Sequence, residues 1–77
     1  EKNQRGVAYM SKLINDLVGK QCIIRSEFIF SFAGKTELSC KIIDADDEWI
    51  KICYTEKKDK QVVKLMRIEN IESIEEQ

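Results

Sequence analysis

Apolar residues recur at every second position through most of this chain, and this alternation constrains the fold more than any other feature. After Gly19, short alternating segments are separated by turn-forming runs such as Asp44–Asp47 and the all-charged Glu56–Lys60. Successive side chains of a β-strand point to opposite faces, so each segment predicts a strand with one buried face. The order predicts a mostly β fold, in which an N-terminal α-helix precedes a five-stranded, strongly bent antiparallel sheet.

The expected strands cover residues 22–32, 38–42, 50–54, 61–68 and 71–75. The first is either one long bent strand or a pair of strands broken near Ser26–Glu27, where a polar residue interrupts the apolar face. The last is open to two interpretations, because Ile68, Ile71 and Ile74 recur at every third residue, as in a helix. A turn at Glu69-Asn70 followed by a short strand would place the same residues inward. We favour the strand, because an antiparallel meander needs a closing partner.

The helix is predicted before Gly19, a residue that can end it in the left-handed conformation. Five apolar residues fall on one helical stripe, at spacings of three and four: Met10, Leu13, Ile14, Leu17 and Val18. Residues 1–9 show no such pattern and are interpreted as a flexible arm or a remnant outside the native chain, with Met10 as the native start. The domain is therefore expected to cover residues 10–77.

The alternation also predicts which side chains are buried. The expected core comprises Cys22, Ile24, Phe28, Phe30, Leu38, Cys40, Ile42, Ile50, Ile52, Val63, Leu65, Ile71 and Ile74. Val62, Met66 and Ile68 would then point outward beside an open sheet edge. Because a chain of 77 residues buries little surface alone, we expect it to form homo-oligomers through its edge strands.

Composition excludes several classes of function. The chain has no histidine, so His-dependent zinc sites and His-dependent nucleophilic catalysis are excluded, and we expect neither an enzyme nor a cofactor nor a metal site. Its three cysteines form no C-x-x-C pair and lie among apolar residues, which favours buried thiols in a reducing, cytoplasmic setting. No signal peptide and no membrane span is predicted.

Several segments, taken together from Met10 to Glu75, resemble the bacterial Sm-like (LSm) family. The similarity rests on Leu17-Val18-Gly19-Lys20 before the strand Gln21-Cys22-Ile23-Ile24, and continues through Phe32-Ala33-Gly34-Lys35 and residues 44–52. Residues 66–71 (Met-Arg-Ile-Glu-Asn-Ile) are similar to the family's apolar-Arg-Gly-x-Asn-apolar motif, with Ile68 in place of the glycine. The Tyr-Lys-His signature of the host-factor-type RNA chaperone is absent. The resemblance implies a small barrel that assembles into rings through edge strands and binds RNA.

Charge is distributed in blocks although the net charge is only -1. Residues 44–56 sum to -4, residues 57–67 to +4 and residues 68–77 to -4. The acidic run at 44–48 is interpreted as a solvated turn, with a divalent-cation loop as the alternative. The basic block could contact phosphates, keep the hairpin tip soluble, or face an acidic neighbouring subunit.

Four residues are candidates for contact with single-stranded RNA: Arg67, Asn70, Trp49 and Lys64. Arg67 and Asn70 match the family motif, Lys64 belongs to the basic block, and Trp49 could stack on a base or pack beneath the N-terminal helix. The leading hypothesis is a non-enzymatic, cytoplasmic Sm-like protein that forms a homo-oligomeric ring, with single-stranded RNA as its candidate ligand. The alternative is a small-barrel module for protein–protein interaction or regulation, with no nucleic-acid role.

Overall fold

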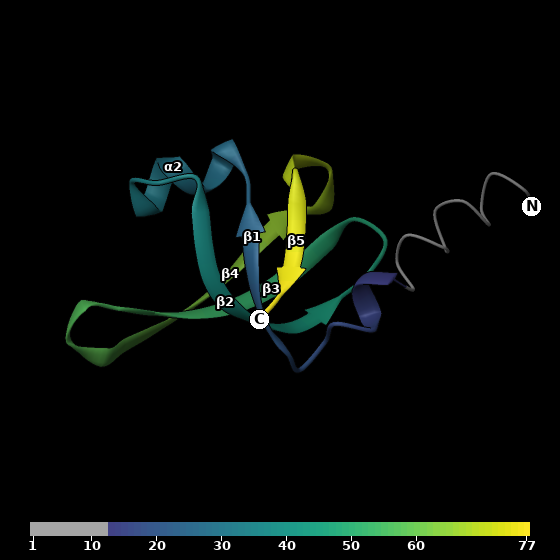
Figure 1. The fold of residues 1–77 in the computed structure, drawn as a ribbon, viewed down its shortest axis with the longest axis horizontal. Coiled ribbons are helices and arrows are strands. Elements are labelled where there is room, and N and C mark those ends of the chain that lie inside the picture. The colour runs from purple at the N-terminus through teal and green to yellow at the C-terminus, as the bar shows by residue number, and fades with distance from the viewer. Residues whose placement is uncertain (1–12) are drawn as a thin grey trace, which may run out of the picture.

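A computed structural model describes residues 13–77, which form one antiparallel sheet with short helices at its ends (Figure 1). The elements are β1 (Gln21–Arg25), α2 (Glu27–Ala33), β2 (Glu37–Ala45), β3 (Trp49–Glu56), η1 (Lys57–Asp59), β4 (Lys60–Arg67), η2 (Ile68–Asn70) and β5 (Ser73–Glu76). The five strands lie in the order β4-β3-β2-β1-β5. The predicted mostly β class with five antiparallel strands is confirmed.

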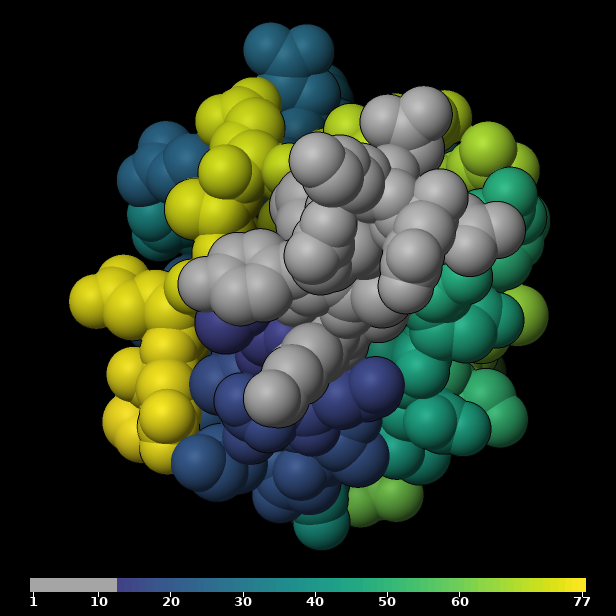
Figure 2. Space-filling model, turned by 90° about the vertical axis from the view of Figure 1, so that its right-hand side faces the viewer, coloured from purple at the N-terminus to yellow at the C-terminus, as the bar shows by residue number. Residues whose placement is uncertain are grey.

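The predicted arm at residues 1–9 and the native start at Met10 lie outside the described residues. Of the predicted N-terminal helix, residues 13–15 are helical and are followed by turns that end at Gly19, whose φ is +88°. The Gly19 N–H donates to the carbonyl of Ile42 at 2.6 Å, which holds this segment against β2. Figure 2 shows these first described residues, in purple and blue, between the yellow C-terminal strand and the teal residues of β2 and β3.

The prediction of strand structure through residue 32 is wrong, because the segment after β1 forms the helix α2. Ser26 begins this helix by accepting a hydrogen bond from the N–H of Phe28, and Gly34, with φ +75°, ends it. Ile29 is buried, whereas Phe28 and Phe30, both assigned to the core, are 40% and 61% exposed. The helix turns them to the surface because its stripe follows spacings of three and four rather than two.

The predicted inward face of β4 is also wrong. Val63 and Leu65 are 59% and 52% exposed, whereas Met66, expected on the outside, is fully buried. The register explains the inversion, because Met66 lies opposite Ile50 and cross-strand partners share one face of a sheet. Apolar residues occupy both faces of this strand, so alternation alone does not determine which face points to the core.

The remaining core predictions are confirmed or nearly so. Seven predicted residues are buried: Cys22, Ile24, Leu38, Cys40, Ile42, Ile50 and Ile52. Ile71 and Ile74 are partly buried against this core, and the strand interpretation of the C-terminus is confirmed by β5. A register shift between Ile42 and Asp44 interrupts the β2–β3 pairing. Bulges of this kind bend the strands that contain them, and both strands are curved in Figure 1.

The helices of the described part of the chain include none that is long and apolar enough to cross a membrane.

Candidate functional site

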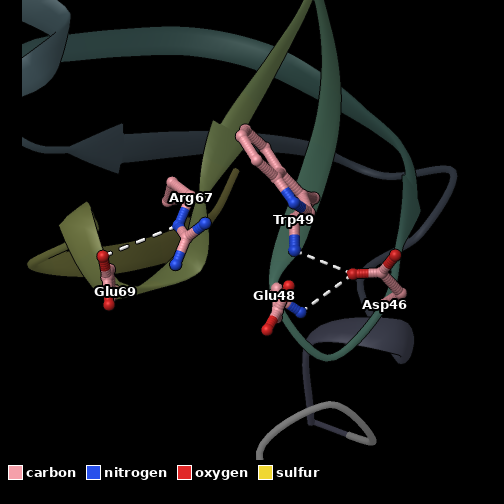
Figure 3. Close-up of polar contacts among 5 residues, drawn as sticks. All are labelled: Asp46, Glu48, Trp49, Arg67 and Glu69. Carbon is pink, nitrogen blue, oxygen red and sulfur yellow. Dashed lines mark hydrogen bonds and ion pairs between the residues drawn. The ribbon is translucent and has the colours of Figure 1, made fainter.

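The turn between β2 and β3 is organised by the carboxylate of Asp46. One of its oxygens, Oδ1, accepts hydrogen bonds from the N–H groups of Glu48 and Trp49, both at 2.8 Å (Figure 3). These two bonds favour the charged form and lower the pKa of Asp46. Because this oxygen already accepts two backbone hydrogen bonds, the turn matches the solvated-turn interpretation of the acidic run. Within residues 13–77, no group of three or more acidic or cysteine side chains is placed to bind a metal ion.

Trp49 and Arg67 form the centre of the candidate site. They lie directly opposite each other on β3 and β4, and the guanidinium carbon of Arg67 is 5.2 Å from the centroid of the Trp49 ring. The N–H of Ile68 donates to the carbonyl of Glu48 at 2.8 Å, so in the alternating ladder Trp49 and Arg67 are a non-hydrogen-bonded pair, whose side chains approach closely. Trp49 is 38% exposed, so its side chain is only partly covered by the rest of the chain.

Carboxylates lie on both sides of this pair. Arg67 Nε is 3.5 Å from Glu69 Oε2, and the turn carrying Asp46 and Glu48 lies on the other side (Figure 3). The positive charge of Arg67 is therefore partly compensated by its own chain. Such surroundings weaken attraction to a phosphate but leave the ring and guanidinium faces able to stack.

The other two predicted RNA contacts lie elsewhere. Lys64 is on the opposite face of β4, where its ammonium nitrogen lies 4.2 Å from the centroid of the Phe32 ring. Asn70 ends η2, where its backbone carbonyl accepts a hydrogen bond from the Ser26 hydroxyl. Asn70 also lines a hollow of about 460 Å³ whose other lining residues are Glu27, Phe28, Glu69 and Glu72. The structure thus brings together Trp49 and Arg67, and separates Lys64 from them.

The predicted basic block is likewise divided. Three of its lysines lie at the tip of the β3–β4 hairpin, at positions 57, 58 and 60. Arg67 is at the other end of β4, seven residues from Lys60, or roughly 23 Å along an extended strand. These charges do not make one continuous phosphate-binding surface.

The sequence interpretation missed an exposed apolar surface on the outer face of the hairpin. Val63 and Leu65 lie there, in the same row of residues as Arg67, and face the same side as Trp49. Beside them a small hollow of about 140 Å³ is lined by Asp44, Ala45, Asp46, Trp49, Lys51 and Leu65. The signal was present in the sequence, since the adjacent pairs Val62-Val63 and Leu65-Met66 place apolar residues on both faces of one strand.

Comparison with known proteins finds no match to this chain among protein-family models, curated proteins or solved structures. Two features of the described structure bear on its function: the two edges of the sheet, and the corner where Trp49 meets Arg67.

Proposed function

We propose that this chain is a non-enzymatic, Sm-like small-barrel subunit that assembles with copies of itself through β4 and β5. The observation that carries the proposal is the strand order, β4-β3-β2-β1-β5, which leaves β4 and β5 as the two outer strands of the sheet. Unpaired strand edges are templates for pairing with another chain. The resemblance in sequence to the Sm-like family supports the same mode of assembly.

The β4 edge offers a row of outward-pointing backbone groups. Because Ile68 and Glu48 are bonded at one end of the β3–β4 ladder, the even-numbered residues of β4 bond to β3. The N–H groups of the odd-numbered residues, including Val63 and Leu65, therefore point away from the sheet.

The same reasoning applies to β5. Its ladder with β1 is fixed by the bond from the Gln77 N–H to the Gln21 carbonyl, at 3.0 Å. Ser73 and Glu75 then bond to β1, while the N–H groups of Ile74 and Glu76 point outward. Each edge can thus donate and accept hydrogen bonds along a neighbouring strand.

The small core supports assembly as well. The chain has 77 residues, and all three of its cysteines are free thiols, so no disulfide supplements the core. Domains of this size bury only about 60% of the surface that their unfolded chain exposes. Pairing of edges between copies would add buried surface that one chain lacks.

Solution mass tests the proposal. Sedimentation or light scattering should give a multiple of 9.0 kDa, and a 9.0 kDa monomer at all concentrations would overturn it. Glu76→Pro removes one outward N–H of β5 without removing a bond to β1, so it should shift the mass toward that of the monomer. Glu76→Ala is the matched control, because it also removes the carboxylate that pairs with Lys20 at 3.6 Å but keeps the N–H.

As part of the proposed function, the Trp49–Arg67 pair stacks on an unpaired base of single-stranded RNA. The support is the exposed ring with a guanidinium held beside it. Anisotropy of labelled A-rich and U-rich oligonucleotides at two salt concentrations tests this. Arg67→Ala should weaken binding and leave the solution mass unchanged, and Trp49→Ala should weaken binding as well. Because carboxylates surround Arg67, we expect a shallow dependence on salt.

The second candidate, a protein-interaction module, is favoured by the acidic surroundings of Arg67 and the exposed apolar residues beside it. A ligand protein would meet Trp49 and Leu65 at the centre of such a surface, with Asp46 and Glu48 at its rim. Absence of oligonucleotide binding at micromolar protein would remove the RNA proposal and leave this candidate. The predicted cytoplasmic location stays a prediction in both cases.

A further inference from the structure

The outer face of the β3–β4 hairpin is apolar at its middle. We call this surface, defined by Trp49, Lys51, Cys53, Val63 and Leu65, the hairpin face. Cys53 lies directly opposite Val63, and Lys51 directly opposite Leu65. Val63 and Leu65 are 59% and 52% exposed, and because they lie on the same face of one strand they form an apolar patch rather than isolated exposed residues.

Opposite charges lie at the two ends of the hairpin face. At one end is the β2–β3 turn, whose acidic residues Asp44, Asp46, Asp47 and Glu48 exceed the neighbouring Arg67 by three charges. At the other end is the hairpin tip, residues 56–60, whose three lysines exceed its two acidic residues by one charge. Figure 1 shows the β2–β3 turn and the hairpin tip at opposite ends of these two long strands.

We propose that the hairpin face is a contact between two copies of this chain, related by a two-fold axis and running antiparallel. In that arrangement the basic tip of each hairpin lies on the acidic turn of the other, and the apolar middles meet. The parallel arrangement would instead place lysines against lysines and carboxylates against carboxylates. Charge complementarity therefore favours a second copy of this chain as the partner, and favours the antiparallel orientation over the parallel one.

The two-fold axis has a definite place on the hairpin. The midpoint of β3 (Trp49–Glu56) falls between Ile52 and Cys53, and only Cys53 of these two is on the outer face. The partner's Cys53 would therefore lie close to Cys53 across the axis. Cys22 and Cys40 are buried, so Cys53 is the cysteine that reports on this contact.

The contact is small. Eight residues of strand span roughly 26 Å, and two strands are roughly 10 Å wide, which gives a projected area of about 260 Å² for each copy. A standard stable interface buries about 800 Å² for each partner. We therefore expect a weak, salt-sensitive dimer that a short cross-linker can trap. This contact does not depend on pairing of the sheet edges.

Cross-linking of the full chain with a short bismaleimide tests the proposal. At high micromolar protein and low salt, we expect a covalent dimer joined through Cys53, mapped by mass spectrometry, that is lost in Cys53→Ser. Leu65→Lys should reduce the dimer about tenfold or more, whereas Gln61→Lys, on the same face but near the tip, should not reduce it comparably. Absence of the dimer while Cys53 still reacts with a monofunctional maleimide would overturn the proposal.

Charge reversal tests the direction of pairing. A tip variant (Lys57→Glu with Lys58→Glu) and a turn variant (Asp47→Lys with Glu48→Lys) should each lose self-cross-linking. The tip variant places acidic tips on acidic turns, and the turn variant changes the charge of residues 44–48 from -4 to 0, which removes the attraction. An equimolar mixture should restore cross-linking in part as a heterodimer, because the basic tip of the turn variant then lies on the unchanged acidic turn of the tip variant. Thermal melts of both variants establish that they are folded. If each variant cross-links like the unchanged protein, the antiparallel arrangement is wrong.

Glu76→Pro separates this contact from the proposed edge assembly. It should lower the solution mass but leave Cys53 cross-linking unchanged. A protein that assembles without cross-linking at Cys53 would overturn the hairpin-face dimer alone, and a cross-linked protein that never exceeds the mass of a dimer would overturn the edge assembly alone.

Discussion

The hydroxyl of Ser26 donates a hydrogen bond to the backbone carbonyl of Asn70, 44 residues away in sequence. The same oxygen accepts the N–H of Phe28 at 3.1 Å, and the side chain is fully buried. One small polar group therefore both begins α2 and fixes η2 against the end of β1. Since η2 carries the chain from Arg67 to β5, this bond helps to hold the candidate site against the rest of the sheet.

Replacing Ser26 by alanine should destabilise the fold. The variant loses the cap of α2 and leaves the Asn70 carbonyl without its buried donor, so the free energy of unfolding should fall by about 1–3 kcal/mol. Urea denaturation measures this. Ser31→Ala is the control, because the Ser31 hydroxyl donates to the Phe28 carbonyl at the surface, and it should cost less than about 0.5 kcal/mol. Equal losses in the two variants would contradict the bridging role of Ser26.

Asp46 should make stability depend on acid pH. Its pKa is lowered in the folded protein by the N–H groups of Trp49 and Glu48. The stabilisation is therefore present above the unfolded pKa of about 3.9 and is lost as the pH falls through the lower folded pKa. Thermal melts from pH 7 to pH 2 should show Asp46→Ala less stable than the unchanged chain at neutral pH, with the difference shrinking in acid. A difference that is constant with pH would contradict this.

The buried thiol of Cys40 should produce the opposite dependence at alkaline pH. Burial, with smaller contributions from Cys22 and Cys53, raises the pKa of Cys40 to about 12. The stabilisation is full below the unfolded pKa of about 8.5, and it declines as the pH rises toward the folded value because only the unfolded thiol ionises. Urea midpoints should therefore fall between pH 8 and pH 10.

Thiol labelling provides an independent measurement of the same burial. Under native conditions Cys53 should react with a thiol reagent first, and Cys22 and Cys40 only at the rate of unfolding, since both are buried. Rapid native labelling of Cys40 would contradict both its burial and its raised pKa.

Glycine at the hairpin tip should stabilise the protein. Lys58 has φ +66° and Asp59 has φ +60°, in the left-handed region that lysine adopts less readily than aspartate. Lys58→Gly should therefore raise the free energy of unfolding by about 0.5–1 kcal/mol, and Asp59→Gly by less. The neighbouring Lys57 has no positive φ, so Lys57→Gly should not stabilise. Urea denaturation of the three variants gives the order, and a destabilised Lys58→Gly would contradict the argument.

The strands were predictable from sequence wherever one face alone is apolar. Leu38, Cys40 and Ile42 alternate with polar residues, and β2 buries all three. Phe28, Phe30 and Phe32 alternate as well, but the cap at Ser26 and the left-handed Gly34 impose a helix on them. The capping signal at Ser26 outweighs the alternation, which by itself shows Ser26 only as a polar interruption of the apolar face.

The candidate site was predictable in part. Trp49 and Arg67 were both named from sequence, but their direct opposition depends on the β3–β4 register, which is set by pairing across the whole hairpin. The position of Lys64 on the opposite face follows from the same register. Wherever apolar residues occupy both faces of a strand, as in β4, its phase depends on its partner strand and not on its own sequence.

The pairing of β5 with β1 has a consequence for local opening of the sheet. The two strands share four residue pairs, such as Arg25 with Ser73, that lie about fifty residues apart in sequence, whereas β3 and β4 are joined by a tight hairpin. Closing so long a loop costs more entropy than closing a hairpin. We therefore expect β5 to dock last in folding and to detach first from the native state. Each detachment bares the edge of β1, onto which the β5 of another copy could dock in exchange.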